Sequence, residues 1–248
     1  MTAPVCPREE PKIRRRISAR KMVLTAKVFR VNADAKLGVI AQKLRDFRRV
    51  DVVREGDREI ELVTDVHDIT GGKDYVTGVF SRDKLVRIKQ RGGVVPVVRT
   101  VDAYIEFRDR GDKIFLIVLQ QKHFANFVAT TLSNALFLNF RSIVEARIPH
   151  ERLVELHERN PDGTRLIWFD QVDYPGVEKL ALAGPSLMDT SMYDEALRHG
   201  KIWYIVFVSR EKSRVFGLTR NAVFTAFSRL SEQDFLEHVR TEVIPLLE

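Results

Sequence analysis

The sequence has a single cysteine and no long apolar stretch. Cys6 is the only cysteine in 248 residues, which excludes an intramolecular disulfide framework and a zinc site built from several cysteines. No uninterrupted apolar stretch reaches the 18 or so residues that indicate a membrane span. Nothing resembles a signal peptide, because no apolar segment follows the charged N-terminus. We therefore expect a cytoplasmic protein without a membrane partner.

Amide side chains are also scarce. Asn and Gln total 12 residues, whereas charged residues make up 30% of the chain. Amides and thiols degrade at high temperature, where ion-pair networks cost less desolvation. The composition therefore favours a thermophilic source. With 44% hydrophobic residues, the chain can bury the core of one large domain or two small ones.

Positive charge is concentrated in the first 21 residues. This segment holds seven basic and two acidic side chains, three prolines and no apolar periodicity, so we predict a disordered arm over residues 1–21. Its basic cluster of Arg14, Arg15 and Arg16 can neutralise backbone phosphates. The alternative is a solvated tail, or translation that starts at Met22.

A second basic stretch lies between residues 82 and 99. Asp83 is its one acidic residue, and its basic residues are Arg82, Lys84, Arg87, Lys89, Arg91 and Arg99. The alternation predicts a strand with Arg87, Lys89 and Arg91 on one face, where they can follow a sugar-phosphate backbone. The alternative is an edge strand whose basic side chains block aberrant pairing, or a solvated face.

The hydrophobic patterns indicate an α+β protein. Strand patterns with turn signals between them run from residue 23 to 31 and from 50 to 119. Helical spacing predicts helices over residues 37–47, 124–136 and 150–158, and a C-terminal helix capped by Ser231 with Asp234 three residues later. We expect antiparallel sheets with helices packed on one face.

The chain shows a weak internal repeat at an offset of 100 residues. Six residues recur at that offset, namely Tyr104, Ile105, Phe107, Arg110, Phe124 and Phe127, which match Tyr204, Ile205, Phe207, Arg210, Phe224 and Phe227. The matches suggest a tandem duplication of an α+β unit. The corresponding division of the chain is residues 22–140 and 141–248.

Motifs for catalysis are weak. Asp65, His67 and Asp68 can supply metal ligands only if the strand bends before Thr70, and a polar turn is the alternative. Trp203, Tyr204 and Phe207 can stack nucleobases, but apolar residues on both faces favour a buried strand. The sequence shows no Ser, His and Asp arrangement and no glycine-rich phosphate loop. We expect no catalytic residue, cofactor or bound metal.

The charge distribution favours a non-enzymatic nucleic-acid-binding protein. The basic strand face and the N-terminal arm would contact the phosphates of DNA or RNA. A protein interaction or assembly module, including a homo-oligomer, is the alternative. A metal-dependent nuclease that uses Asp65 and His67 is a third hypothesis.

Overall fold

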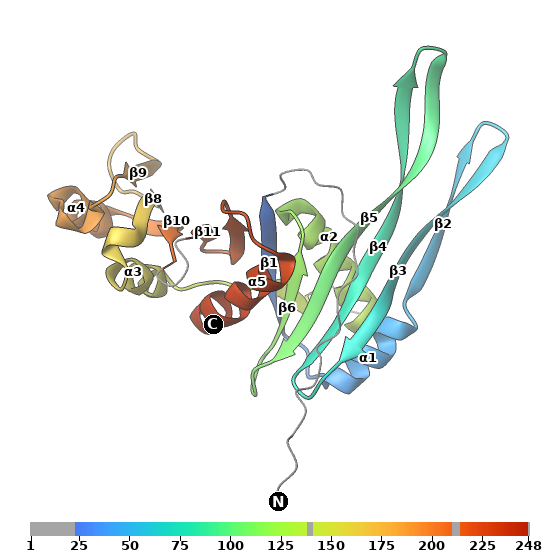
Figure 1. Ribbon diagram of the computed structural model, residues 1–248, viewed down its shortest axis with the longest axis horizontal. Helices are drawn as coiled ribbons and strands as arrows, with labels where there is room; N and C mark the ends of the chain where they lie inside the picture. Colours follow the sequence, from blue (N-terminus) through green and yellow to red (C-terminus); the bar gives the residue numbers. More distant parts are fainter. Residues whose placement is uncertain (1–22, 138–140, 210–213, 248) are drawn as a thin grey trace, which may run out of the picture.

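The protein is built on one open antiparallel sheet. The computed structural model describes residues 23–137, 141–209 and 214–247, and these residues form a 12-stranded sheet with five α-helices (Figure 1). This confirms the α+β class with antiparallel pairing. No helix in the described ranges is long and apolar enough to cross a membrane.

The strands follow the order β2-β3-β4-β5-β6-β1-β12-β11-β10-β8-β9, and β7 pairs with β1 outside this path. Their bounds are β1 Leu24–Val31, β2 Arg48–Glu55, β3 Arg58–Gly71, β4 Tyr75–Gln90, β5 Gly93–Asp109, β6 Ile114–Leu119, β7 Ile143–Glu145, β8 Thr164–Asp170, β9 Lys179–Ala183, β10 Lys201–Val208, β11 Val215–Thr219 and β12 Val223–Ala226. The helices are α1 Leu37–Arg45, α2 Lys122–Phe137, α3 His150–Glu158, α4 Ser191–His199 and α5 Glu232–His238.

Strand β1 joins the two halves of the sheet. Along one edge it pairs with β6, and along the other it pairs with β12 through residues 24–27 and with β7 through residues 29–31. β6 lies in the first of the two units expected from the sequence, whereas β7 and β12 lie in the second. The sheet therefore runs through the expected boundary without a break.

Helices lie on both sides of β1. Successive strand residues point to opposite faces: Ala26 and Val28 belong to a buried cluster that also includes residues of α5, whereas Phe29 and Val31 belong to a cluster with α1 and α2. Figure 1 shows α5 and α2 on opposite sides of β1 and β6. The expectation of helices on one face is therefore not confirmed. Both faces of β1 and β6 carry apolar residues, so each face needs its own cover.

Local signals in the sequence produce several of the elements. The α5 helix begins where the Ser231 hydroxyl accepts a hydrogen bond from the Asp234 N–H at 3.0 Å, as the capping pattern predicts. The α3 helix spans His150–Glu158, the range that the helical spacing indicates. At the β2–β3 turn Gly56 has a φ of 63°, a left-handed conformation that glycine adopts without steric cost.

The internal repeat matches only in part. Its two copies both contain an antiparallel hairpin, β5–β6 in the first and β10–β11 in the second. The next segment is the helix α2 in the first copy and the strand β12 in the second. Phe124 therefore lies on a helix and its match Phe224 on a strand, and the duplication stays a prediction.

A buried ionic network fixes the C-terminal helix to the sheet. The Glu106 side chain on β5 is fully buried and accepts hydrogen bonds from Arg240 at 2.6 and 3.1 Å, from Arg108 at 2.7 Å and from Tyr104 at 2.9 Å. Burial alone would raise the pKa of Glu106, but the hydrogen bonds and charges of Arg240 and Arg108 outweigh it and hold the pKa below its usual range. The carboxylate therefore stays ionised in the interior.

We expect Arg240→Met to lower the free energy of unfolding by up to about 3 kcal/mol, because Glu106 stays buried with only Arg108 as a charged partner. Urea denaturation at neutral pH measures this loss. Wild-type Glu106 has a depressed pKa, so its stabilising contribution is present above the unfolded-state pKa of about 4.3 and disappears as the pH falls below it. The difference between variant and wild type should therefore narrow in acid. Arg159→Met, which breaks an exposed pair with Glu155, is the control and should change little.

Candidate nucleic-acid interface

The basic stretch forms a two-stranded ribbon that extends beyond the sheet. β4 pairs with β3 up to Arg82, and β5 pairs with β6 only from Tyr104 onward, whereas β4 and β5 pair with each other to the Gln90–Gly93 turn. We call residues 83–100 the β4–β5 ribbon. Each of its strands has about eight residues, which gives a length of about 26 Å. Figure 1 shows the ribbon as the longest projection of the molecule.

Two of the predicted contact residues lie at the base and pack against helix α2. The Arg82 guanidinium lies 3.7 Å from the ring centroid of Phe127, and the Lys84 ammonium lies 5.1 Å from that of Phe124. Such cation–π contacts hold a cation over an aromatic face. Arg82 and Lys84 are both half-buried. These two residues therefore join the base of the ribbon to the core around α2.

Arg87 links the ribbon to the neighbouring hairpin. Its guanidinium donates to both carboxylate oxygens of Glu55, at the end of β2, with a shortest distance of 2.9 Å. This interaction raises the pKa of Arg87, so the side chain stays charged. Part of its charge is neutralised within the protein.

Three basic residues of the ribbon remain available. Lys89, Arg91 and Arg99 are exposed, and none of them has a side-chain partner among the described residues. Lys89 shares a face with Arg87, but Arg91 lies in the turn after β4, and Arg99 pairs across from Lys84 on the opposite face. The expectation that Arg91 continues one strand face is therefore wrong, because the strand ends at Gln90. The free cations are spread along the ribbon instead, from Arg99 at its base to Arg91 at its tip.

The ribbon also exposes apolar side chains. Val86 pairs with Val97 and Ile88 with Val95, so the four form one patch on a single face. We call these residues the apolar quartet. Each is between 36 and 45% exposed, which is unusual for clustered β-branched side chains. The ribbon thus presents both charge and apolar surface.

The neighbouring β2–β3 hairpin provides an internal comparison. Residues 48–63 carry four basic and five acidic side chains. Its ion pairs include Arg49 with Asp51 at 2.8 Å and Arg54 with Glu59 at 2.8 Å. This hairpin is charge-balanced, whereas the β4–β5 ribbon with Arg82 has six basic residues and one acidic residue.

The arrangement around His67 is polar but does not form a metal site. A backbone irregularity after His67, with Asp68 at a φ of 52°, brings the Asp68 carboxylate to 3.1 Å from His67 Nδ1. His67 Nε2 lies 2.8 Å from Ser81 Oγ, which donates to Asp102 at 2.7 Å. No group of three or more metal-capable side chains occurs within the described ranges. The structure therefore gives the nuclease hypothesis no metal centre there.

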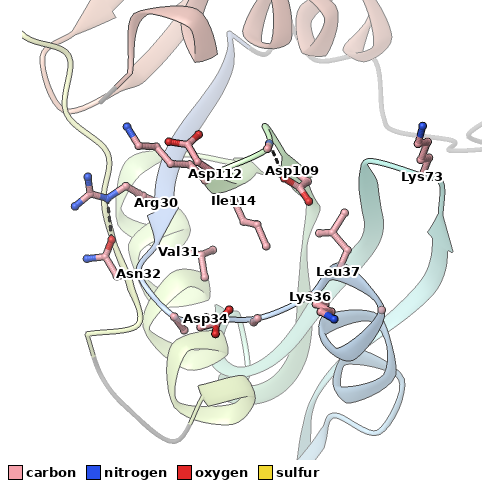
Figure 2. A pocket seen from close by; sticks show the side chains of 15 residues that line it. Arg30, Val31, Asn32, Asp34, Lys36, Leu37, Lys73, Asp109, Asp112 and Ile114 are labelled. Atoms are coloured by element: carbon pink, nitrogen blue, oxygen red, sulfur yellow. Dashed lines mark hydrogen bonds between the residues drawn. The ribbon is translucent and has the colours of Figure 1, made fainter.

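An open cleft of about 770 Å³ lies at the end of β1, and Figure 2 shows the side chains that line it. Val31, Leu37 and Ile114 point toward its centre, whereas Arg30 and Lys73 point away from it. The Arg30 side chain donates to Asn32 at 2.8 Å. The charged groups therefore do not converge on one position in this cleft.

The arginines of the N-terminal arm and the aromatic residues of the possible stacking platform remain to be placed. Arg14, Arg15 and Arg16 lie outside the described residues. Trp203 and Tyr204 lie on β10, half-buried, and Phe207 is buried, so a strand covered on both faces fits better than an open stacking platform. Trp203 nevertheless lines a second cleft, of about 780 Å³, which the sequence patterns did not indicate.

No protein-family model matches the chain, and a search of curated proteins finds no significant match.

Proposed function

We propose that the protein binds nucleic acid through the β4–β5 ribbon. The observation that carries this proposal is the charge difference between two adjacent hairpins of the same sheet. One hairpin carries nearly equal numbers of basic and acidic side chains, with Arg49 and Arg54 in ion pairs, whereas the other has a strong excess of basic residues and presents Lys89, Arg91 and Arg99 without partners in the described structure. Counterion release from phosphates would drive binding at such unpaired cations.

The shape of the ribbon supports the same proposal. A two-stranded ribbon fits the major groove of a DNA duplex, which is about 12 Å wide. Cations on both faces and at the tip would reach the phosphates on either side of the groove, while Val and Ile side chains contact base edges. Among the described residues no strand pairs with either outer edge of the ribbon, although the β2–β3 hairpin lies beside it and contacts Arg87 through Glu55.

We expect charge reversal at the free cations of the ribbon to weaken binding. The triple variant Lys89→Glu, Arg91→Glu, Arg99→Glu should lose on the order of tenfold or more in affinity for a duplex probe, and the dependence of log K on log salt should become shallower by about 0.9 for each lost phosphate contact. Fluorescence anisotropy with duplex DNA, single-stranded DNA and RNA measures both quantities.

The matched control reverses the same number of charges on the other hairpin. Arg48→Glu, Arg54→Glu, Arg58→Glu changes the net charge equally, but should leave most of the affinity intact. If both variants lose affinity to the same extent, binding follows net charge rather than the ribbon, and the proposal fails.

Removal of the ribbon should separate binding from folding. Asp83 and Thr100 are directly opposite each other, so an Asn-Gly turn between them closes the shortened hairpin with a favoured two-residue loop. We expect this variant to keep its thermal midpoint within a few degrees and to lose salt-dependent binding. Circular dichroism and anisotropy test this, and full binding by the shortened protein would contradict the proposal.

The apolar quartet favours a second candidate function, assembly of several copies of the chain. Burying Val86, Ile88, Val95 and Val97 against a second ribbon would remove four exposed apolar side chains from water. Sedimentation velocity over a range of protein concentrations should then show a dimer. Ile88→Thr with Val95→Thr should dissociate it, whereas Val50→Thr with Val52→Thr, at exposed positions of β2, should not. A wild-type monomer at all concentrations would exclude this function.

A further inference from the structure

The second cleft lies in the C-terminal half of the sheet, far from the ribbon in sequence. It has a volume of about 780 Å³, within the range of small-molecule sites. Residues of β7, β8, β10 and β12 line it, together with the first residues of α2 and α3. The lining residues come from eight separate stretches of the sequence between Lys122 and Val223, so only the tertiary structure brings them together.

The cleft has an excess of unpaired positive charge. Lys122, Arg147 and Lys201 line it, and none has a side-chain partner among the described residues. All three are exposed, so they remain accessible to a ligand. The arrangement is typical of sites for anions.

Two of the three acidic side chains in the cleft are neutralised by the protein. The Asp170 carboxylate accepts from Arg220 through two hydrogen bonds, at 2.6 and 2.9 Å. Glu145 pairs with Lys27, a fully buried lysine that also donates to Asn126 at 2.7 Å. With these two carboxylates paired, Glu151 is the one acidic group that opposes the free cations.

His150 adds a neutral hydrogen-bond donor. Its Nδ1 accepts a hydrogen bond from the Ile202 N–H at 3.0 Å, which places the ring proton on Nε2. Burial lowers the pKa of His150, and the charges of Lys201 and Arg220 lower it further against the opposing effects of Glu151 and Asp170. The ring is therefore neutral at pH 7. His150 also begins α3, whose first backbone N–H groups favour an anion.

Backbone strain occurs at the same cleft. Among the described residues, three that are not glycine have a positive φ. One of them, Gln171 at 54°, lines the cleft, and another, Ala222 at 55°, lies between the lining residues Asn221 and Val223. Such conformations cost free energy and cluster at functional sites. The strain is an observation independent of the charges.

We propose that this cleft binds a phosphorylated ligand of nucleotide size. The phosphate would contact the cations Lys122, Arg147 and Lys201, and the half-buried indole of Trp203 supplies apolar lining. The phosphate could belong to a free nucleotide or to the phosphorylated end of a nucleic-acid strand. These two sources share the phosphomonoester, which is the chemical class that the cleft selects. The proposal does not depend on the ribbon.

Isothermal titration calorimetry of the full chain with adenosine 5′-monophosphate and with adenosine tests the proposal. The monophosphate should bind at least tenfold more tightly, because adenosine lacks the dianion. The variant Lys122→Gln, Arg147→Gln, Lys201→Gln should lose this preference. A matched control, Lys36→Gln, Lys73→Gln, Lys113→Gln, removes three charges that line the cleft of Figure 2 and should retain it.

Two further comparisons complete the experiment. A 5′-phosphorylated oligonucleotide that competes better than the monophosphate would identify a strand end as the source, and equal or weaker competition would identify a free nucleotide. The ribbon-deleted protein should bind the monophosphate as the full chain does, so failure of the ribbon proposal leaves this one testable. Absence of binding to the wild type, equal binding of adenosine, or equal loss in both triple variants would overturn the proposal.

Discussion

The fold depends on the backbone hydrogen bonding of β1 to three other strands. This strand of eight residues pairs with β6 along one edge and with β7 and β12 along the other. Its position between the two halves of the sheet explains why both of its faces are buried and why each face has its own cluster of helices. It also explains the buried Lys27, whose charge can be tolerated because Glu145 on β7 and Asn126 on α2 meet it.

The ribbon arises where strand pairing stops. Beyond Arg82, no strand of the described residues pairs with β4 on the β3 side, and the backbone polar groups that β3 and β4 leave unpaired there need other partners. Asp83 supplies one at this position: its carboxylate accepts from the Val63 N–H of β3 at 3.0 Å, and also from the Thr100 hydroxyl of β5 at 2.6 Å. Cation–π contacts of Arg82 and Lys84 with α2 add a second attachment. The base is therefore held by specific contacts, whereas the tip is surrounded by solvent.

The two proposed sites, on the ribbon and in the cleft, would bind their ligands through different interactions. On the ribbon, cations are exposed on a projecting element and would act mainly through long-range attraction and counterion release. In the cleft, a neutral histidine, a helix N-terminus and neutralised carboxylates surround the free cations, so a ligand would be held by directed hydrogen bonds. The buried Glu106 and Arg240 form a third cluster of charges, which attaches the helical turn after α5 to the sheet.

Local patterns were sufficient to predict much of this protein. The Ser231 cap, the range of α3 and the strand that carries Arg87 and Lys89 follow from side-chain periodicity and backbone preferences, which act between near neighbours. Strand order and partners did not follow, because pairings such as Thr25 with Thr225 join residues 200 positions apart. The same long-range contacts set the end of the sheet beside Asp83, covered both faces of β1, and brought Lys122, Arg147 and Lys201 to one cleft. Charge content is a property of the chain, but whether a charge is paired depends on the residues that folding places beside it.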